Sequence, residues 1–409
     1  MEIIRRICQR ALLVFIFMGI NAAACTAVRG TVNGKVTGIS DDPLVRAVVY
    51  VSGTSDQTVT DETGRFSINI PTNRKEILIQ SLGYQEIAVQ LGDDRNTVEV
   101  ELKPLWKREW LLAMASQKAD PDFEVNIDSQ TFPPGEGPII TVDEGHHNFH
   151  TAAERYSHFA DILKKDGYVV ARSGKAFTAE NLDGVEILVV ATPLNGMETG
   201  TLPAQSAFKD EEITQLRDWV HQGGSLFLVS DHMPIPGAFE NLLQAFGVRA
   251  LNGVALSSDT LATLTDSTII FRRSDGSLRP HLLIDGLNSS ERINSVASQG
   301  GCAFQVGEDF QPLFVLPDNV VSLQWEKWFC ENYENCFGPD VPRIPVGGWL
   351  QAAVGKIGKG RVAIMGEAGM FAAQIRGKNQ HKSGLSDPRL AENPQFILNV
   401  MHWLSGQID

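Results

Sequence analysis

The spacing of hydrophobic and polar positions changes once along the chain, near Pro138. Before it, residues 29–103 hold short runs in which apolar and β-branched residues alternate with polar ones, as in GTVNGKVTG, LVRAVVYVSG, GRFSINI and NTVEVEL. Such runs, separated by Gly, Asp, Asn and Pro, are typical of strands with one buried face. They predict a small all-β sandwich. The turn Asp61–Gly64 predicts a hairpin with Gly64 at positive φ.

After Pro138, apolar runs alternate with amphipathic stretches. The runs PIITV, YVVA, VEILVVATP, SLFLVSDH and GRVAIMGEAGM predict buried strands, and the stretches 151–167, 210–224, 236–247 and 394–406 predict helices. Thr151 and Glu154 form a capping-box pattern, which predicts that the first helix begins at Thr151. The alternation predicts an α/β domain over 138–409 with a doubly wound, mostly parallel sheet.

Two further segments interrupt this organisation. Residues 257–345 are rich in Ser, Gly and short strand-like runs, which predicts a β-rich insertion that covers a site. Residues 104–137 form a linker, in which Trp106 and Trp110 are expected to anchor an interface. A length of 409 residues suits two domains.

The first 24 residues have the pattern of an export signal. Arg5, Arg6 and Arg10 precede the apolar run Ala11–Ile20, and three alanines, 22–24, follow it. The protein is therefore expected in the periplasm or outer cell envelope. No later apolar run reaches the length of a transmembrane helix, so none is expected in the mature protein.

The cysteines leave two questions open. Cys25 follows the alanines directly, so it is either a lipid-anchored residue or an ordinary residue after the cleavage site, and Ala22 stands where a lipoprotein signal usually has Leu. Cys330 and Cys336 are expected to form a local disulfide in an oxidising compartment. A zinc site is the alternative, although no nearby His supports it. Cys302 is expected to be a buried free thiol.

Charge and composition narrow the classes of partner. A hydrophobic fraction of 43% indicates a folded protein, and a net charge of −14 argues against nucleic-acid binding. No phosphate-binding glycine motif appears. The expected partners are a small molecule, glycan or peptide, with a partner protein on the β-sandwich.

The first segment resembles a known family of modules. PLVRAVVYVSGT at 43–54, TDETGRFSI at 60–68 and SLGYQE at 81–86 are similar to the carboxypeptidase-regulatory-like domain. The resemblance implies a β-sandwich with a structural or docking role in an exported protein, and it brings no catalytic residues.

Polar side chains suited to chemistry follow three of the predicted strands. They are Asp143, Glu144, His146, His147, Asn148 and His150 after the first strand, Ser230, Asp231 and His232 after the fourth, and Glu367 after the last, with Gln374 and Arg376 further on. Ligands bind at the carboxyl ends of the strands in open parallel sheets, so these groups are expected to meet.

Histidines and carboxylates together suit a divalent metal such as zinc. The candidate metal ligands are His146, His147, His150, Asp231 and His232, and the candidate catalytic residues are Asp143, Glu144 and Glu367. The alternative is that these are loop residues bonded to the backbone, since there is no HExxH. Ser230, Asp231 and His232 cannot form a triad among themselves, because neighbours on a strand point to opposite faces.

The larger domain resembles the class I glutamine-amidotransferase-like superfamily, which has a flavodoxin-like sheet. VEILVVATP, GGSLFLVSDH and GRVAIMGEAGM match the strands that carry that family's oxyanion loop, nucleophile and His–Glu pair. Ser230-Asp231-His232 stands where the family has its Cys, and the third strand keeps Glu367 without a His. The prediction is therefore a metal-dependent, hydrolytic site rather than an amidotransferase. The alternative is a non-catalytic module that binds a glycan, peptide or partner protein.

Overall fold

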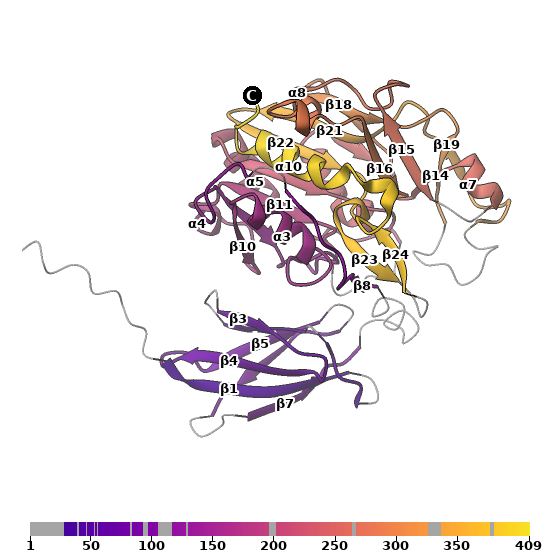
Figure 1. Ribbon diagram of the computed structural model, residues 1–409. Coiled ribbons are helices and arrows are strands. Elements are labelled where there is room, and N and C mark those ends of the chain that lie inside the picture. The colour runs from indigo at the N-terminus through magenta and orange to yellow at the C-terminus, as the bar shows by residue number, and fades with distance from the viewer. Residues whose placement is uncertain are drawn as a thin grey trace, which may run out of the picture. The chain divides into compact units, whose positions relative to one another are not determined.

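The computed structural model describes residues 28–38, 41–45, 47–52, 54, 56–81, 84–92, 97–104, 117–127, 130–195, 202–263, 267–325, 337–376 and 380–409. The chain divides into two compact units (Figure 1): unit 1 is Met1–Gln80 with Glu86–Glu101, and unit 2 is Ser81–Gln85 with Leu102–Asp409. The expected signal peptide, Cys25, Trp106, Trp110, Cys330 and Cys336 lie outside the described residues. Within them, no helix has the length and apolar character needed to cross a membrane.

Unit 1 consists of two small sheets. One has the order β4 (Arg65–Pro71), β1 (Val28–Thr37), β7 (Thr97–Glu101), and the other β3 (Gln57–Val59), β2 (Val48–Val51), β5 (Glu76–Gln80), β6 (Ile87–Gln90). Alternation along β4 buries Phe66, Ile68 and Ile70, as the sequence pattern predicts for a strand with one buried face. The all-β character expected of this segment agrees with the structure.

The turn at Asp61–Gly64 is partly as predicted. Gly64 has φ +74°, and its N–H donates to the Asp61 carbonyl at 2.9 Å. The flanking strands do not form a hairpin, however, because β3 pairs with β2 and β4 pairs with β1. The turn instead carries the chain from one sheet to the other.

Unit 2 is built on a nine-stranded sheet. Five strands are parallel, in the order β10 (Val169–Ser173), β9 (Ile139–Asp143), β11 (Ile187–Ala191), β12 (Ser225–Val229), β22 (Gly360–Met365). All residues of β11 and β12 are buried, so both faces of the sheet centre are covered. The apolar runs of the sequence thus form buried parallel strands, as expected.

The same sheet continues with antiparallel strands. They are β21 (Leu350–Ile357), β17 (Phe304–Val306), β13 (Val248–Ala250) and β18 (Phe310–Val315). The segment 257–345, expected to be an insertion that adds β structure, contributes strands β17 and β18, which pair with β21 and extend the main sheet. The expected sheet, doubly wound and mostly parallel, is therefore matched only in its five-stranded half.

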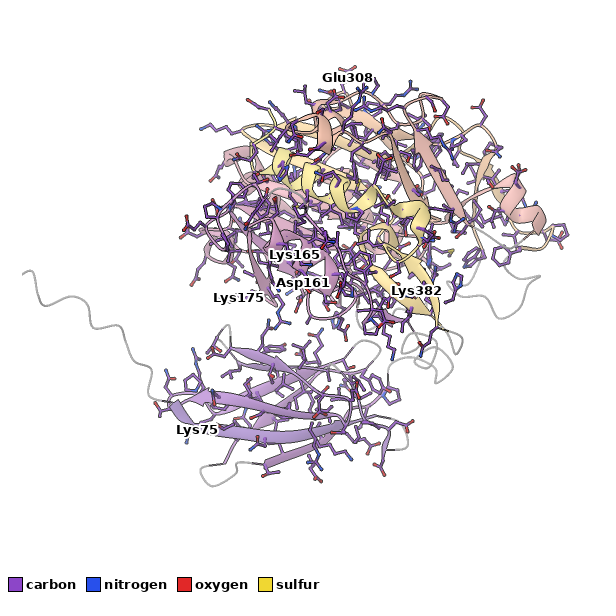
Figure 2. The ribbon with its side chains drawn as sticks, viewed as in Figure 1. Lys75, Asp161, Lys165, Lys175, Glu308 and Lys382 are labelled. Carbon is purple, nitrogen blue, oxygen red and sulfur yellow. The ribbon has the colours of Figure 1, made fainter. Side chains whose placement is uncertain are left out.

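Three smaller sheets complete unit 2. They are β14 (Val254–Ser257), β19 (Val320–Leu323) and β20 (Arg343–Pro345); β15 (Thr268–Arg272) and β16 (Ser295–Gln299); and β24 (His381–Gly384), β23 (Ala373–Arg376) and β8 (Lys118–Ala119). Charged side chains such as Asp161, Lys165 and Glu308 lie at the exposed periphery of the unit (Figure 2).

The helices form two groups. Helix α3 (Ser157–Lys165) packs against α10 (Asn393–Leu404), which also packs against β12 and β22. Helix α5 (Asp210–Gln222) packs against α4 (Ala179–Leu182) and α6 (Ile235–Ala245). Short helices α7 (Ser258–Thr263) and α8 (Leu282–Asp285) lie within the 257–345 segment.

The first helix begins at Ser157, so the predicted start at Thr151 is wrong. The Thr151 hydroxyl is buried and caps no backbone N–H, and the Thr151 carbonyl accepts a hydrogen bond from Tyr156 N at 3.0 Å. Residues 151–156 therefore form a turn, which directs the Tyr156 side chain into the protein, where it is fully buried.

Candidate functional site

Asp231 and Glu367 follow two neighbouring strands at the carboxyl edge of the parallel sheet. Val229 of β12 lies opposite Met365 of β22, and the Ser230 N–H continues the ladder by donating to the Met365 carbonyl at 2.8 Å. Each carboxylate therefore stands two residues beyond a pair of aligned positions, and the two negative charges act on each other. This is the edge at which open parallel sheets bind ligands.

One turn holds both carboxylates through its main chain. The N–H of Ala368 donates to Asp231, while Gly369 N and Met370 N donate to the two oxygens of Glu367, each at 2.7 Å. The N–H of Gln299 in β16 also donates to Glu367. Consecutive backbone donors thus fix the position of both acidic groups.

The two carboxyl groups have perturbed proton affinities. Burial and then the charge of Asp231 raise the pKa of Glu367 to about 8. Burial also raises the pKa of Asp231, against the opposing effects of His232 and Arg376. Because two close carboxylates resist ionising together, the charge of each carboxyl group favours the protonated form of the other.

The site runs from solvent to the interior. His232 and Arg376 are exposed, Asp231 is half-buried, and Glu367 is only 3% exposed. Behind the pair, Cys302 is buried beside the Ser230 hydroxyl, and its thiol is free, as predicted. Burial raises the pKa of Cys302 to about 12, so this thiol does not serve as a nucleophile.

The histidine-rich loop divides between two places. His150 is buried, with Nδ1 3.1 Å from Thr192 Oγ1 and Nε2 3.1 Å from Gln374 Nε2. Burial lowers the pKa of His150, so the ring is neutral; its Nδ1–H donates to Thr192 and its Nε2 accepts from Gln374. Thr192 has φ +44°, an unusual backbone conformation for a β-branched residue.

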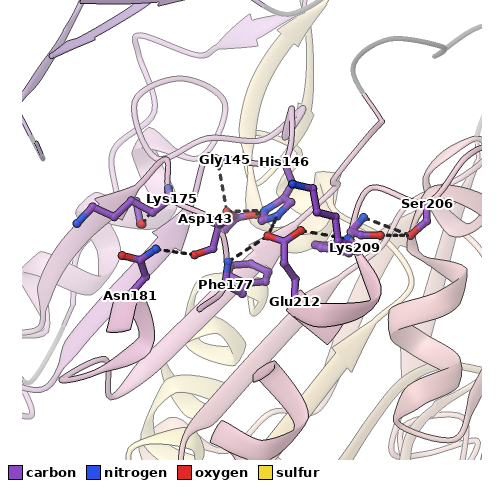
Figure 3. A network of polar contacts seen from close by, with 12 residues as sticks. Asp143, Gly145, His146, Lys175, Phe177, Asn181, Ser206, Lys209 and Glu212 are labelled. Carbon is purple, nitrogen blue, oxygen red and sulfur yellow. Dashed lines mark hydrogen bonds and ion pairs between the residues drawn. The ribbon is translucent and has the colours of Figure 1, made fainter. Parts of the chain in front are cut away.

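His146 belongs to a second cluster, with Asp143 and Glu212 (Figure 3). Its Nδ1 lies 2.9 Å from Asp143 Oδ2 and its Nε2 lies 3.1 Å from Glu212 Oε1, with all three side chains buried. Burial lowers the pKa of His146, but Asp143 and then Glu212 outweigh it and raise that pKa to about 10. The ring is therefore an imidazolium that donates to a carboxylate on each side.

Aromatic rings and backbone N–H groups hold this cluster in place. The Phe177 and Phe208 rings lie 4.5 and 4.7 Å from the His146 ring, centroid to centroid. Glu212 also accepts from the backbone N–H groups of Phe177 and Lys209, each at 3.1 Å. The cluster thus joins the loop after β9 to the start of α5.

Glu144 and His147 of the loop differ in setting. Glu144 accepts a hydrogen bond from Ala152 N at 3.0 Å and lies 3.9 Å from Arg172; burial raises the pKa of its carboxyl to about 6. His147 is half-buried, with φ +48°.

The expected metal ligands do not fit a metal in this arrangement. Both ring nitrogens of His146 face carboxylate oxygens, and both of His150 have hydrogen-bonding partners. Within the described ranges, no three His, Cys, Asp or Glu side chains are grouped as they would be around a metal ion. Of the candidate residues, Asp231, His232 and Glu367 come together, whereas Asp143 and His146 form the second cluster.

Two contributors to these clusters could not be identified in the sequence. Glu212 lies within an amphipathic helix pattern, where an acidic residue is expected to face solvent. Tyr156 lies in the segment predicted as helix, so its buried position next to Glu367 had no signal.

Three solved structures that resemble this chain have low sequence identity to it. The mmIFT52 N-terminal domain is 13% identical, with 65% of this chain and 97% of that one covered, at a TM-score of 0.44. The cytoplasmic protein STM1381 from Salmonella typhimurium LT2 is 12% identical, covering 67% and 100%, at 0.34. A putative ThuA-like protein from Bacteroides uniformis ATCC 8492 is 9% identical, covering 69% and 94%, at 0.32.

Comparison of sequences places one part of the chain. No curated protein matches the chain. A family model matches residues 32–106, the segment that forms most of unit 1. The matching family is the CarboxypepD_reg-like domain, to which the motifs of this segment are similar.

Proposed function

We propose that unit 2 is a hydrolase that uses Asp231 and Glu367 as an acid–base pair. The observation that carries the proposal is the placement of two carboxyl groups, one buried and one half-buried, at adjacent strand ends, where burial and the charge of Asp231 raise the pKa of Glu367 to about 8. Two carboxyl groups in opposite protonation states are the usual apparatus for hydrolysis of glycosidic bonds and, in aspartic proteases, of peptides.

In the proposed reaction, water attacks the carbon of the scissile bond. The Asp231 carboxylate takes a proton from this water, and Glu367 gives its proton to the oxygen or nitrogen of the leaving group. Transfer of the proton from Asp231 to Glu367 then restores the starting state. His232 and Arg376 favour the ionised form of Asp231 and so support its part as the base.

The test is hydrolysis of a panel of nitrophenyl glycosides and fluorogenic peptides. Asp231→Asn and Glu367→Gln should each lower kcat/KM by about 100-fold or more. The matched controls are Asp161→Asn and Glu308→Gln, which make the same changes at exposed positions. Equal activity in all four variants would assign the hydrolysis to a contaminant and remove the proposal.

A second function is favoured by one observation. Both oxygens of Glu367 accept backbone hydrogen bonds, so a structural role for this carboxylate would account for its burial without catalysis. In that case unit 2 binds a glycan, peptide or partner protein. Binding that survives Asp231→Asn, with no hydrolysis by the parent protein, would favour this alternative.

We further propose that unit 2 is related to the class I glutamine-amidotransferase-like superfamily. The chain order of its five parallel strands across the sheet is 2-1-3-4-5, which is the order of flavodoxin-like sheets. CarboxypepD_reg-like domains are typical of exported proteins, which supports export through residues 1–24. Mass spectrometry of the mature N-terminus would test both the cleavage site and a lipid on Cys25.

A further inference from the structure

Tyr156 lies near the acid–base pair and makes a polar contact with the turn that holds it. Its side chain is fully buried, and its hydroxyl donates to the Ala368 carbonyl at 3.1 Å. The charges of Glu367 and Asp231 both act on this phenol. Tyr156 is therefore close to both carboxyl groups, and its hydroxyl contacts the main chain of the turn that holds them.

The peptide that Tyr156 contacts is the one that donates to Glu367. The Ala368 carbonyl and the Gly369 N–H belong to the same peptide group, and this N–H lies 2.7 Å from Glu367 Oε1. A hydrogen bond to the carbonyl of a peptide polarises the group and strengthens donation by its N–H, by roughly 10–30% per bond. The Phe371 N–H, at 3.1 Å, is the second donor to the same carbonyl.

Contacts from other elements fix the phenol. The His150 ring lies 4.8 Å from the Tyr156 ring, and Phe159 of α3 lies 5.1 Å from it, centroid to centroid. His150 is held by Thr192 and Gln374, so two strand ends orient the ring that packs on Tyr156. Thr192, whose backbone is strained, therefore supports the packing of His150 on Tyr156.

We propose that Tyr156 is a positioning residue for Glu367. Tyr156 acts on Glu367 through the Ala368–Gly369 peptide. Its hydroxyl orients and polarises that peptide, so that the Gly369 N–H holds one oxygen of Glu367 in place. The proposal deepens the function above, because it assigns the group that sets the geometry and hydrogen bonding of the proposed acid.

The sequence offers a direct way to observe this peptide. Ala368–Gly369 is the single Ala-Gly dipeptide in the chain. Protein labelled with carbonyl-13C alanine and 15N glycine therefore gives one correlated amide signal, from Gly369. The proton shift of that signal reports the strength of the bond to Glu367, and the measurement needs no substrate.

Tyr156→Phe should move the Gly369 amide proton upfield, because loss of the hydroxyl weakens donation by the peptide. Tyr168→Phe is the matched control, since it removes a hydroxyl bonded to Ser405 rather than to the turn, and it should leave the signal in place. An unmoved signal in folded Tyr156→Phe would overturn the proposal. Glu367→Gln should itself move the signal, which verifies what the signal reports.

A second substitution covers failure of Tyr156→Phe to fold. Fluorotyrosine at position 156 keeps the ring and makes its hydroxyl a stronger donor, so the signal should move downfield. No movement would again overturn the proposal. The signal is recorded without substrate and with Asp231 intact, so an absence of hydrolysis by the parent protein would overturn the proposed function alone, and an unmoved signal in Tyr156→Phe would overturn this inference alone.

Discussion

Gly301 lies against the side chain of Glu367, and a Cβ atom built on Gly301 would stand 2.6 Å from Cβ of Glu367. The same atom would clash with the Gly366 carbonyl, and the backbone at Gly301 has φ +85°. The segment between β16 and β17 therefore approaches the proposed acid as closely as a main chain can.

Gly301→Ala should destabilise unit 2 and displace Glu367. The control is Gly276→Ala, where φ is +78° but the nearest atom lies 3.9 Å away, so it carries the backbone strain without the clash. Urea unfolding should show Gly301→Ala to be less stable than the control by about 1–3 kcal/mol, the usual cost of overpacking. Equal stability would mean that the segment moves freely away from Glu367.

The titration of Glu367 predicts a change of stability with pH. Its pKa in the folded protein, about 8, is raised above the ordinary value of 4.5. A raised pKa contributes stability below pH 4.5 that is lost as the pH rises through 8. Glu367→Gln removes this loss. The free energy of unfolding of the variant relative to that of the parent should therefore increase between pH 5 and pH 9, as measured by urea unfolding. A constant difference would indicate an ordinary, unburied carboxylate.

Replacement of His146 should lower the stability of unit 2 rather than remove a metal ion. His146→Ala leaves Asp143 and Glu212 buried without their shared partner, and removal of one member of a buried ion pair costs about 3–5 kcal/mol. Thermal unfolding and metal analysis should be done on the same samples. His281→Ala, at a partly exposed histidine, is the control. A metal that leaves with His146 would restore the zinc prediction made from the sequence.

The boundary of unit 2 can be tested by truncation. Strand β8 pairs with β23, and Phe123, Val125 and Ile127 pack against the core, so residues before 130 belong to the fold. A fragment of residues 117–409 should melt cooperatively, whereas 130–409 should melt at a lower temperature. If both fragments melt alike, the 117–127 segment adds nothing to stability.

How far the sequence predicts this structure depends on the range of the interactions. Buried runs such as SLFLV identify β12 because apolar character over five residues is a local signal. The pairing of β17 and β18 with β21 involves residues far apart in the chain, and the sequence carries no local mark of it. The site follows the same rule. Asp231 and Glu367 could be predicted from strand ends, whereas Glu212 and Tyr156 depend on tertiary placement.

The turn after β22 holds both carboxyl groups by main-chain N–H groups of residues 368–370. These bonds themselves place no demand on the side chains of Ala368 and Met370, which are buried, while proline at either position would remove a donor. Gly369 is more restricted, since a Cβ there would lie 2.7 Å from Glu367 Oε1. A search for related sites should thus look for an acid followed two residues later by glycine, and should tolerate variation around it.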